Sequence, residues 1–190
     1  MPAGDWPRGE RGIAALPGRE AEFKHGVAHA LDYARILGTR MVHAMAGIGG
    51  QHETFVRNLR YAAREAAKDG ITITIEPINP HDQPGYFLTH QAQAHAIREE
   101  VGEPNLEVQM DLYHVQMTEG DITAKIRRYL AHVAHIQIAG APGRHEPDTG
   151  EVNYLHLFRV LDETGYEGWI GCEYFPRAGT EEGLAWMRQT

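Results

Sequence analysis

Segments typical of β-strands and segments typical of α-helices alternate along this chain, and this alternation limits the folds that it can adopt. Strand-like runs rich in Val and Ile are each followed by a run with apolar residues at helical spacing. The expected strands are 41–47 (with a Gly-rich turn at its end), 71–76, 106–111, 133–138 and 169–174. The expected helices are 20–38, 52–69, 90–101, 122–132, 154–164 and 181–188. Strict alternation of this kind predicts a parallel sheet.

The expected strands have one apolar face and one polar face. In the strand at 71–76, for example, Ile73 and Ile75 alternate with Thr74 and Glu76. A doubly wound sheet is covered by helices on both faces, so its strands would be apolar almost throughout. A polar face opposite an apolar one instead indicates a barrel, with helices outside and a functional mouth.

The expected fold class is therefore α/β, of the (β/α)8 TIM-barrel type. A complete barrel of this type needs about 250 residues, whereas the chain has 190. We expect one domain over residues 1–190, an N-terminally truncated barrel with about five complete parallel strands; a smaller open sheet is the alternative. An unclosed barrel has two unpaired strand edges. We expect a partner subunit or the N-terminal residues to cover them, and a homo-oligomer is the favoured arrangement.

Four polar residues lie at the ends of four successive expected strands: Glu76, Asp111, Gln137 and Glu173. Parallel strands joined by helices bring such ends together at one mouth. Carboxylate and amide oxygens there would form a site for a hard divalent cation such as Mg²⁺ or Mn²⁺. The carboxylates could also move protons. Any one of them alone is more simply a polar group satisfied at a strand end.

Two histidines lie close to these positions. His114 follows Asp111 by three residues, just past the strand end, where it can face the mouth and donate to a substrate oxygen; the alternative is a loop histidine bonded to backbone. His43 lies near the end of an earlier strand, as a substrate contact or as a core or rim histidine.

The long loop 140–151 follows the strand that carries Gln137. Loops on this face of a barrel carry function. Arg144 is the best candidate in it for binding a substrate carboxylate, because a guanidinium can pair with a carboxylate through two bonds. The alternative is a solvated loop with a few salt bridges. Glu146 and Asp148 would then brace the loop.

The amino-acid composition limits the classes of partner that the protein can bind. The formal net charge of −8 argues against nucleic-acid binding. No run approaches the ~18 apolar residues of a membrane span, and the N-terminus has no apolar signal core. We therefore expect a cytoplasmic protein with neither a membrane nor a nucleic-acid partner. The single cysteine, Cys172, fits a reducing compartment. We expect its thiol in the core and Trp169 filling the barrel interior.

Several segments of the chain resemble one known family. IEPIN, MDLYH, HIQIAGAPGRHEPDTGEVNY and GCEYFP are similar to segments of the hydroxypyruvate isomerases, which belong to the xylose-isomerase-like TIM barrels and include the 2-oxo-tetronate isomerases. The resemblance implies metal ligation by Glu76, Asp111, Gln137 and Glu173, with Glu76 and Glu173 as the catalytic pair. Related sugar epimerases usually have His where this chain has Gln137, which favours the isomerase branch.

The resemblance makes a small 2-oxo acid the expected substrate. The favoured reaction is the isomerisation of hydroxypyruvate to 2-hydroxy-3-oxopropanoate (tartronate semialdehyde) through an enediolate. The alternatives are a 2-oxo-tetronate isomerase and a non-catalytic, truncated scaffold that binds metal. A metal-dependent nuclease on the same barrel is a further alternative. The net negative charge and the lack of a Lys/Arg cluster argue against it.

Overall fold

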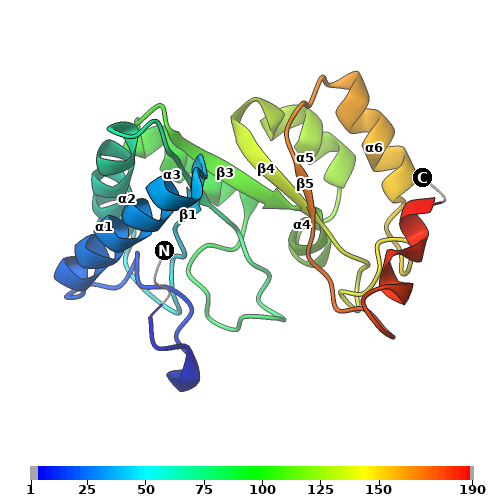
Figure 1. Cartoon of the computed structure of the whole chain (residues 1–190), viewed down its shortest axis with the longest axis horizontal. Coiled ribbons are helices and arrows are strands. Elements are labelled where there is room, and N and C mark those ends of the chain that lie inside the picture. Colours follow the sequence, from blue (N-terminus) through cyan, green and yellow to red (C-terminus); the bar gives the residue numbers. More distant parts are fainter. Residues whose placement is uncertain (1–3, 189–190) are drawn as a thin grey trace. The chain divides into compact units, whose positions relative to one another are not determined.

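The computed structural model describes residues 4–188 and divides into two compact units (Figure 1). Unit 1 extends to Val108 and unit 2 begins at Gln109. The boundary falls inside strand β3 (Leu106–Asp111), which carries the chain from one unit into the other. Strands follow the order β1-β2-β3 up to this point and β3-β4-β5 after it. None of the described helices is long and apolar enough to cross a membrane.

Unit 1 contains three helices that pack on one another and on the strands. Its elements are η1 (Trp6–Arg8), α1 (Glu20–Leu37), β1 (Met41–His43), α2 (His52–Ala67), β2 (Thr72–Ile75), α3 (Gln91–Val101) and the first part of β3. All were predicted within a few residues except η1, a single turn too short for a periodic signal. Helix α1 ends at Gly38, whose φ of 69° and N–H bond to Ala34 O form the C-terminal cap.

The strands of unit 1 are parallel, as predicted. Val42 pairs with Ile73 and His43 with Thr74, and Ile75 pairs with Val108. The apolar face belongs to one core shared with α2, in which the side chains of Ile73 and Ile75 are fully buried. The alternation of faces therefore predicted correctly which side of β2 the helices cover.

Between η1 and α1 the chain forms a loop, of which residues 12–15 are buried. Ala15 N donates to Ala46 O at 2.8 Å, and the side-chain amide of Asn58 donates to Ala14 O at 2.9 Å. Gly12 enters this loop at φ 93°, and a Cβ atom there would lie 2.4 Å from Met45 O. The loop and the segment after β1 are therefore packed too closely for any side chain at position 12.

We expect Gly12→Ala to destabilise the protein by at least about 2 kcal/mol, because it combines a left-handed backbone with a collision against backbone. Gly9 is the matched control: its φ is 87°, yet nothing lies within 4 Å of a Cβ at that position. Gly9→Ala should cost about 1 kcal/mol, the conformational term alone. Urea unfolding measures both, and equal losses would contradict the close packing of the loop.

Unit 2 packs its helices around the second group of strands. Its elements are the end of β3, α4 (Leu112–Thr118), α5 (Ile122–Tyr129), η2 (Leu130–His132), β4 (Val133–Ile138), α6 (Tyr154–Glu163), β5 (Ile170–Cys172) and η3 (Glu182–Arg188). Strands β4 and β5 are parallel, with Gln137 opposite Gly171. The core contains Ile136 and Ile138 from β4 and Leu157 and Leu161 from α6.

Two predictions for unit 2 were wrong, and so was the alternative that made His114 a loop histidine. His114 lies just past the strand end, as expected, but in α4, which has only seven residues and therefore too little apolar periodicity to be recognised. Cys172 was expected in the core and is exposed. Trp169 was expected to fill the interior, and 80% of its surface is accessible. Cys172 lies on β5 and Trp169 lies directly before it. Among the described residues β5 pairs only with β4, so a position on either face of this strand is not enough to bury a side chain.

Candidate active site

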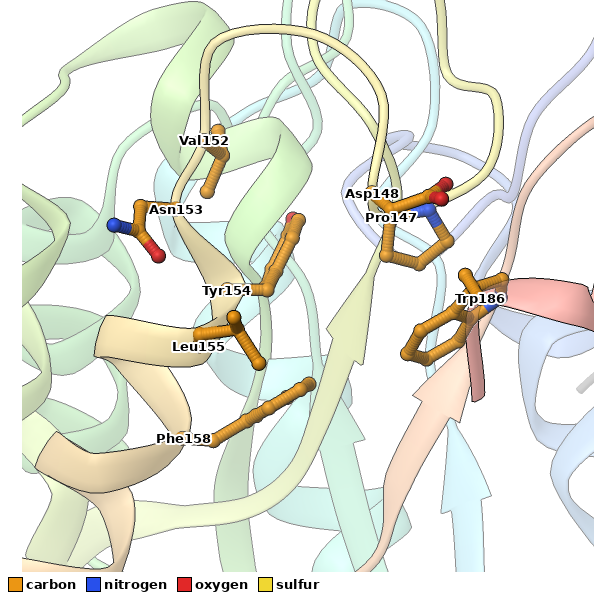
Figure 2. A pocket seen from close by; sticks show the side chains of 8 residues that line it. All are labelled: Pro147, Asp148, Val152, Asn153, Tyr154, Leu155, Phe158 and Trp186. Carbon is orange, nitrogen blue, oxygen red and sulfur yellow. The ribbon is translucent and has the colours of Figure 1, made fainter. Parts of the chain in front are cut away.

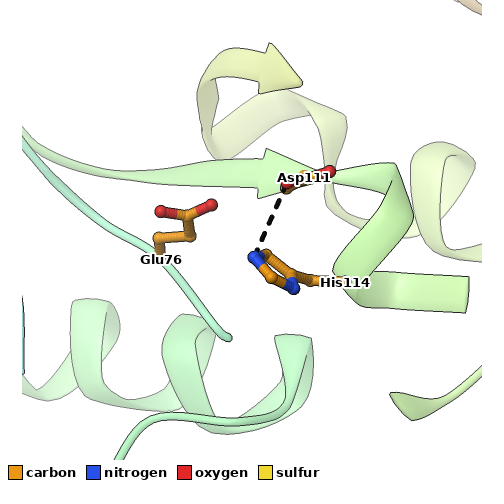
Figure 3. Close-up of side chains that lie close together, drawn as sticks. All are labelled: Glu76, Asp111 and His114. Atoms are coloured by element: carbon orange, nitrogen blue, oxygen red, sulfur yellow. Dashed lines mark ion pairs between the residues drawn. The ribbon is translucent and has the colours of Figure 1, made fainter. Parts of the chain in front are cut away.

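Asp111 joins a strand to a helix. It is the last residue of β3 and the N-cap of α4, where its Oδ1 accepts a hydrogen bond from Tyr113 N at 2.9 Å. The residue is completely buried. His114, in the first turn of α4, places Nε2 3.6 Å from Asp111 Oδ2 (Figure 3). The strand end and the helix cap together therefore fix the direction of both side chains.

Burial dominates the electrostatics of this pair. It raises the pKa of the Asp111 carboxyl to about 7, against the opposing effect of the Arg144 guanidinium. Burial, together with Arg144, lowers the pKa of His114 to about 3. The imidazole of His114 is therefore neutral at physiological pH, and it can accept or donate one hydrogen bond without bringing a charge.

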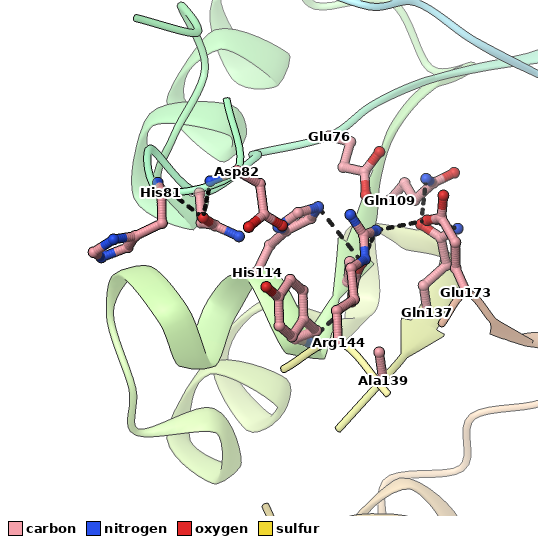
Figure 4. A network of polar contacts seen from close by, with 12 residues as sticks. Glu76, His81, Asp82, Gln109, His114, Gln137, Ala139, Arg144 and Glu173 are labelled. Atoms are coloured by element: carbon pink, nitrogen blue, oxygen red, sulfur yellow. Dashed lines mark hydrogen bonds and ion pairs between the residues drawn. The ribbon is translucent and has the colours of Figure 1, made fainter. Parts of the chain in front are cut away.

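A continuous chain of polar contacts runs across unit 2 (Figure 4). Gln109 Nε2 donates to Gln137 Oε1 at 2.6 Å, and Gln137 Nε2 donates to Glu173 Oε2 at 2.9 Å. The same Glu173 oxygen accepts from Arg144 Nη2 at 3.0 Å, and Arg144 Nη2 also reaches Asp111 Oδ2 at 3.3 Å. The chain thus links the ends of β3, β4 and β5 with the loop after β4.

The donor set of this cluster fits a hard divalent cation. Asp111 and Glu173 direct carboxyl oxygens at one guanidinium nitrogen of Arg144, so two acidic side chains already converge on a single positive charge. The amide of Gln137 contacts the same Glu173 carboxylate and adds a neutral oxygen donor. Oxygen ligands of this kind, with no soft sulfur among them, suit Mg²⁺ or Mn²⁺.

Unit 1 holds the other two predicted residues. Glu76 follows β2 directly and is buried, and His43, the last residue of β1, has its Nδ1 3.8 Å from Glu76 Oε2. Burial lowers the pKa of His43 to about 4, so its ring is neutral. Farther along the chain, Asn79 Oδ1 accepts from the backbone N–H groups of His81 and Asp82 and shapes the turn after Glu76 (Figure 4).

The structure therefore brings five predicted residues together in unit 2 and two in unit 1. The unit 2 group consists of Asp111, His114, Gln137, Arg144 and Glu173, and the unit 1 group of His43 and Glu76. Sequence reasoning did not single out Gln109 as a site residue. The signal was present, because alternation along β3 places it on the same face as Asp111.

A separate pocket of about 220 Å³ is lined by residues from the loop 140–151, from α6 and from η3. Figure 2 shows Leu155 and Phe158 of α6 on one side of it and Trp186 of η3 on the other. Its lining is mainly apolar, and its charged and amide side chains are Asp148 and Asn153. The Asn153 oxygen accepts from His156 N at the start of α6, so it serves as a helix cap.

Comparison with known proteins defines the class. The family model described as "Xylose isomerase-like TIM barrel" matches residues 2–190. The chain belongs to this family, which confirms both the resemblance seen in the sequence and the barrel fold class.

Particular relatives are similar over most of their length. The 2-oxo-tetronate isomerase of Cupriavidus necator is 53% identical, over 97% of this chain and 74% of the relative. The hydroxypyruvate isomerase of Escherichia coli is 48% identical, over 98% and 75%. A crystal structure described as an AP endonuclease, family 2, from Brucella melitensis is 51% identical, with a TM-score of 0.97 over the whole chain and 76% of its own.

Proposed function

We propose that this chain is a divalent-metal-dependent isomerase that interconverts hydroxypyruvate and 2-hydroxy-3-oxopropanoate. The observation that carries the proposal is the polar chain in unit 2, which joins three of the four expected metal ligands, Asp111, Gln137 and Glu173, with Arg144. The relatives from Cupriavidus necator and Escherichia coli, both named as isomerases of small 2-oxo acids, support the same reaction class.

The proposed metal site consists of Glu76, Asp111, Gln137 and Glu173, and the proposed ion is Mg²⁺ or Mn²⁺. When bound, such an ion supplies positive charge that stabilises the enediolate oxygens of the substrate. Asp111 suits this role because its carboxyl group is completely buried, and a nearby cation would favour its ionised form.

The proposed chemistry moves one proton between neighbouring carbons. One glutamate of the pair Glu76 and Glu173 removes a proton from C3 of hydroxypyruvate, and the other returns a proton to C2. The hydroxyl proton on O3 moves to O2, so substrate and product have the same composition and no redox partner is required.

The remaining site residues would hold the substrate. Neutral His114 can bond to a substrate oxygen, and the guanidinium of Arg144 can pair with the substrate carboxylate. In the structure Arg144 already binds carboxylates, those of Asp111 and Glu173, which supports its affinity for this group. His43 lies beside Glu76 and is the third proposed substrate contact.

A four-carbon substrate is the second candidate, because the relative at 53% identity is named a 2-oxo-tetronate isomerase. The chain lengths of the two acids differ by one hydroxymethylene group. A metal-binding scaffold without turnover is the remaining alternative. The predicted homo-oligomer can be checked by light scattering on the same preparation.

The test is isomerisation of hydroxypyruvate and of 2-oxo-tetronate by the purified chain, with Mn²⁺ or Mg²⁺ and with EDTA. We expect turnover of hydroxypyruvate that EDTA abolishes and either metal restores. Preference for the longer acid would move the assignment to the 2-oxo-tetronate isomerases. A cooperatively folded protein that turns over neither acid would support the scaffold instead.

A further inference from the structure

The loop 140–151 and the segment after β5 are tied together by a series of bonds at successive positions. Phe175 N donates to Arg144 O at 2.8 Å, and His145 Nδ1 donates to Phe175 O at 2.7 Å. Two residues farther on, Arg177 N donates to Glu146 Oε1 at 2.9 Å, and its Nε lies 3.3 Å from Oε2. Glu146 is thus the only acidic side chain among these contacts, and it forms the last of them.

The carboxylate of Glu146 is built into this junction. Its side chain is only 11% exposed, and both of its oxygens are engaged by Arg177. Hydrogen bonds from its own backbone N–H and from that of Arg177 lower the pKa of Glu146, so the group is ionised at neutral pH. Its backbone oxygen also accepts from Thr149 N and Oγ1, which closes the turn that follows. A buried, ionised and fully bonded carboxylate is a strong local anchor.

The two segments that Glu146 joins carry two residues of the site. Arg144 lies two positions before Glu146, and Glu173 lies four positions before Arg177. Arg144 has a φ of 52°, a left-handed conformation that an arginine keeps only when its surroundings impose it. The guanidinium of Arg144 meets Glu173 at 3.0 Å, so a shift of one segment along the other would separate them.

We propose that Glu146 is a positioning residue: by tying the loop after β4 to the segment after β5, it holds the Arg144 guanidinium in register with the Glu173 carboxylate. The effect on catalysis rests on the proposed isomerase function. The effect on the junction does not, because it concerns contacts of this chain alone.

The experiment compares Glu146→Ala with Glu146→Gln and with Asp148→Asn, a neighbouring carboxylate that is exposed. Hydrogen–deuterium exchange resolved at the Phe175 amide, which donates to Arg144 O, reports the register directly.

In Glu146→Ala we expect this exchange to accelerate at least about tenfold. We also expect kcat to fall about 10- to 100-fold, since small displacements of reacting groups are costly. The Gln variant, whose amide oxygen can still accept from Arg177 N, should stay within about threefold of wild type in both. Asp148→Asn should match wild type.

Unchanged protection at Phe175 in Glu146→Ala would overturn the proposal, and so would an unchanged kcat. If the alanine variant does not fold, Glu146→Asp replaces it, because the shorter side chain keeps the charge and loses the reach. If the wild type turns over neither 2-oxo acid, the proposed function fails on that result, while the exchange data still decide whether Glu146 fixes the register.

Discussion

Glu173→Gln is expected to lower kcat for hydroxypyruvate by about 10³-fold and to leave the fold intact. A carboxylate that transfers a proton in the rate-limiting step contributes about 10²- to 10⁴-fold, and an amide of the same shape cannot replace it. The structural cost is small because the Glu173 side chain is 57% exposed and follows β5, which has β4 as its described neighbour. Steady-state kinetics and thermal melts of the two proteins measure the two effects separately.

Glu163→Gln is the matched control for this prediction. Glu163 ends α6, its side chain is 65% exposed, and its partner Arg127 lies 3.5 Å away. The substitution removes the same charge from a similarly exposed position outside the site, so kcat should not change. Turnover by Glu173→Gln close to that of Glu163→Gln would remove Glu173 from the catalytic pair.

Asp111→Asn is expected to abolish the stabilisation that added Mn²⁺ confers on the wild type. A ligand that binds only the folded state at 100 times its Kd stabilises it by about 2.7 kcal/mol. Asp111 is the completely buried carboxylate of the proposed set, and neutralising it removes one of three negative ligands. Differential scanning fluorimetry across a Mn²⁺ titration measures the loss, and it does so without any activity assay.

Asp162→Asn provides the comparison, since Asp162 lies exposed on α6. It should keep the full increase in Tm with Mn²⁺. The Asn side chain at 111 can still cap α4 through its Oδ1, so the metal-free variant should melt cooperatively. A Mn²⁺-dependent rise in Tm that survives in Asp111→Asn would place the metal elsewhere, and the proposed ligand set would then be wrong.

Much of the site was visible in the sequence because parallel strands impose simple rules on residue position. Asp111 and Gln137 were placed at the ends of strands from the apolar runs alone, and both lie there in β3 and β4. Glu76 and Glu173 were placed within the expected strands 71–76 and 169–174, and they come directly after β2 and β5, which are shorter. Strand length and alternation are local properties, so the sequence carries them without any knowledge of distant contacts.

Other features depend on which atoms meet across the sequence. Arg144 was predicted to bind a substrate carboxylate, and in the structure it also contacts the carboxyl groups of Asp111 and Glu173. The backbone conformation of the loop decides this contact, and no residue type specifies it. Gln109 likewise belongs to the candidate site through a tertiary contact, the hydrogen bond from its side-chain amide to Gln137 on the next strand. Contacts of this kind connect residues about 30 positions apart, so only the packed structure reveals them.

The sequence by itself determined the order of the strands and helices, the apolar face that β2, β3 and β4 bury and the family to which the chain belongs. These follow from side-chain periodicity and from short motifs, which are local. The tertiary structure alone decided that the Asp111 and His114 side chains are buried away from solvent. It also decided which hydrogen bonds connect Gln109, Gln137 and Glu173, and how Glu146 joins the loop to the segment after β5. Those properties arise from burial and from the geometry of hydrogen bonds between distant residues, and neither exists before the chain has packed.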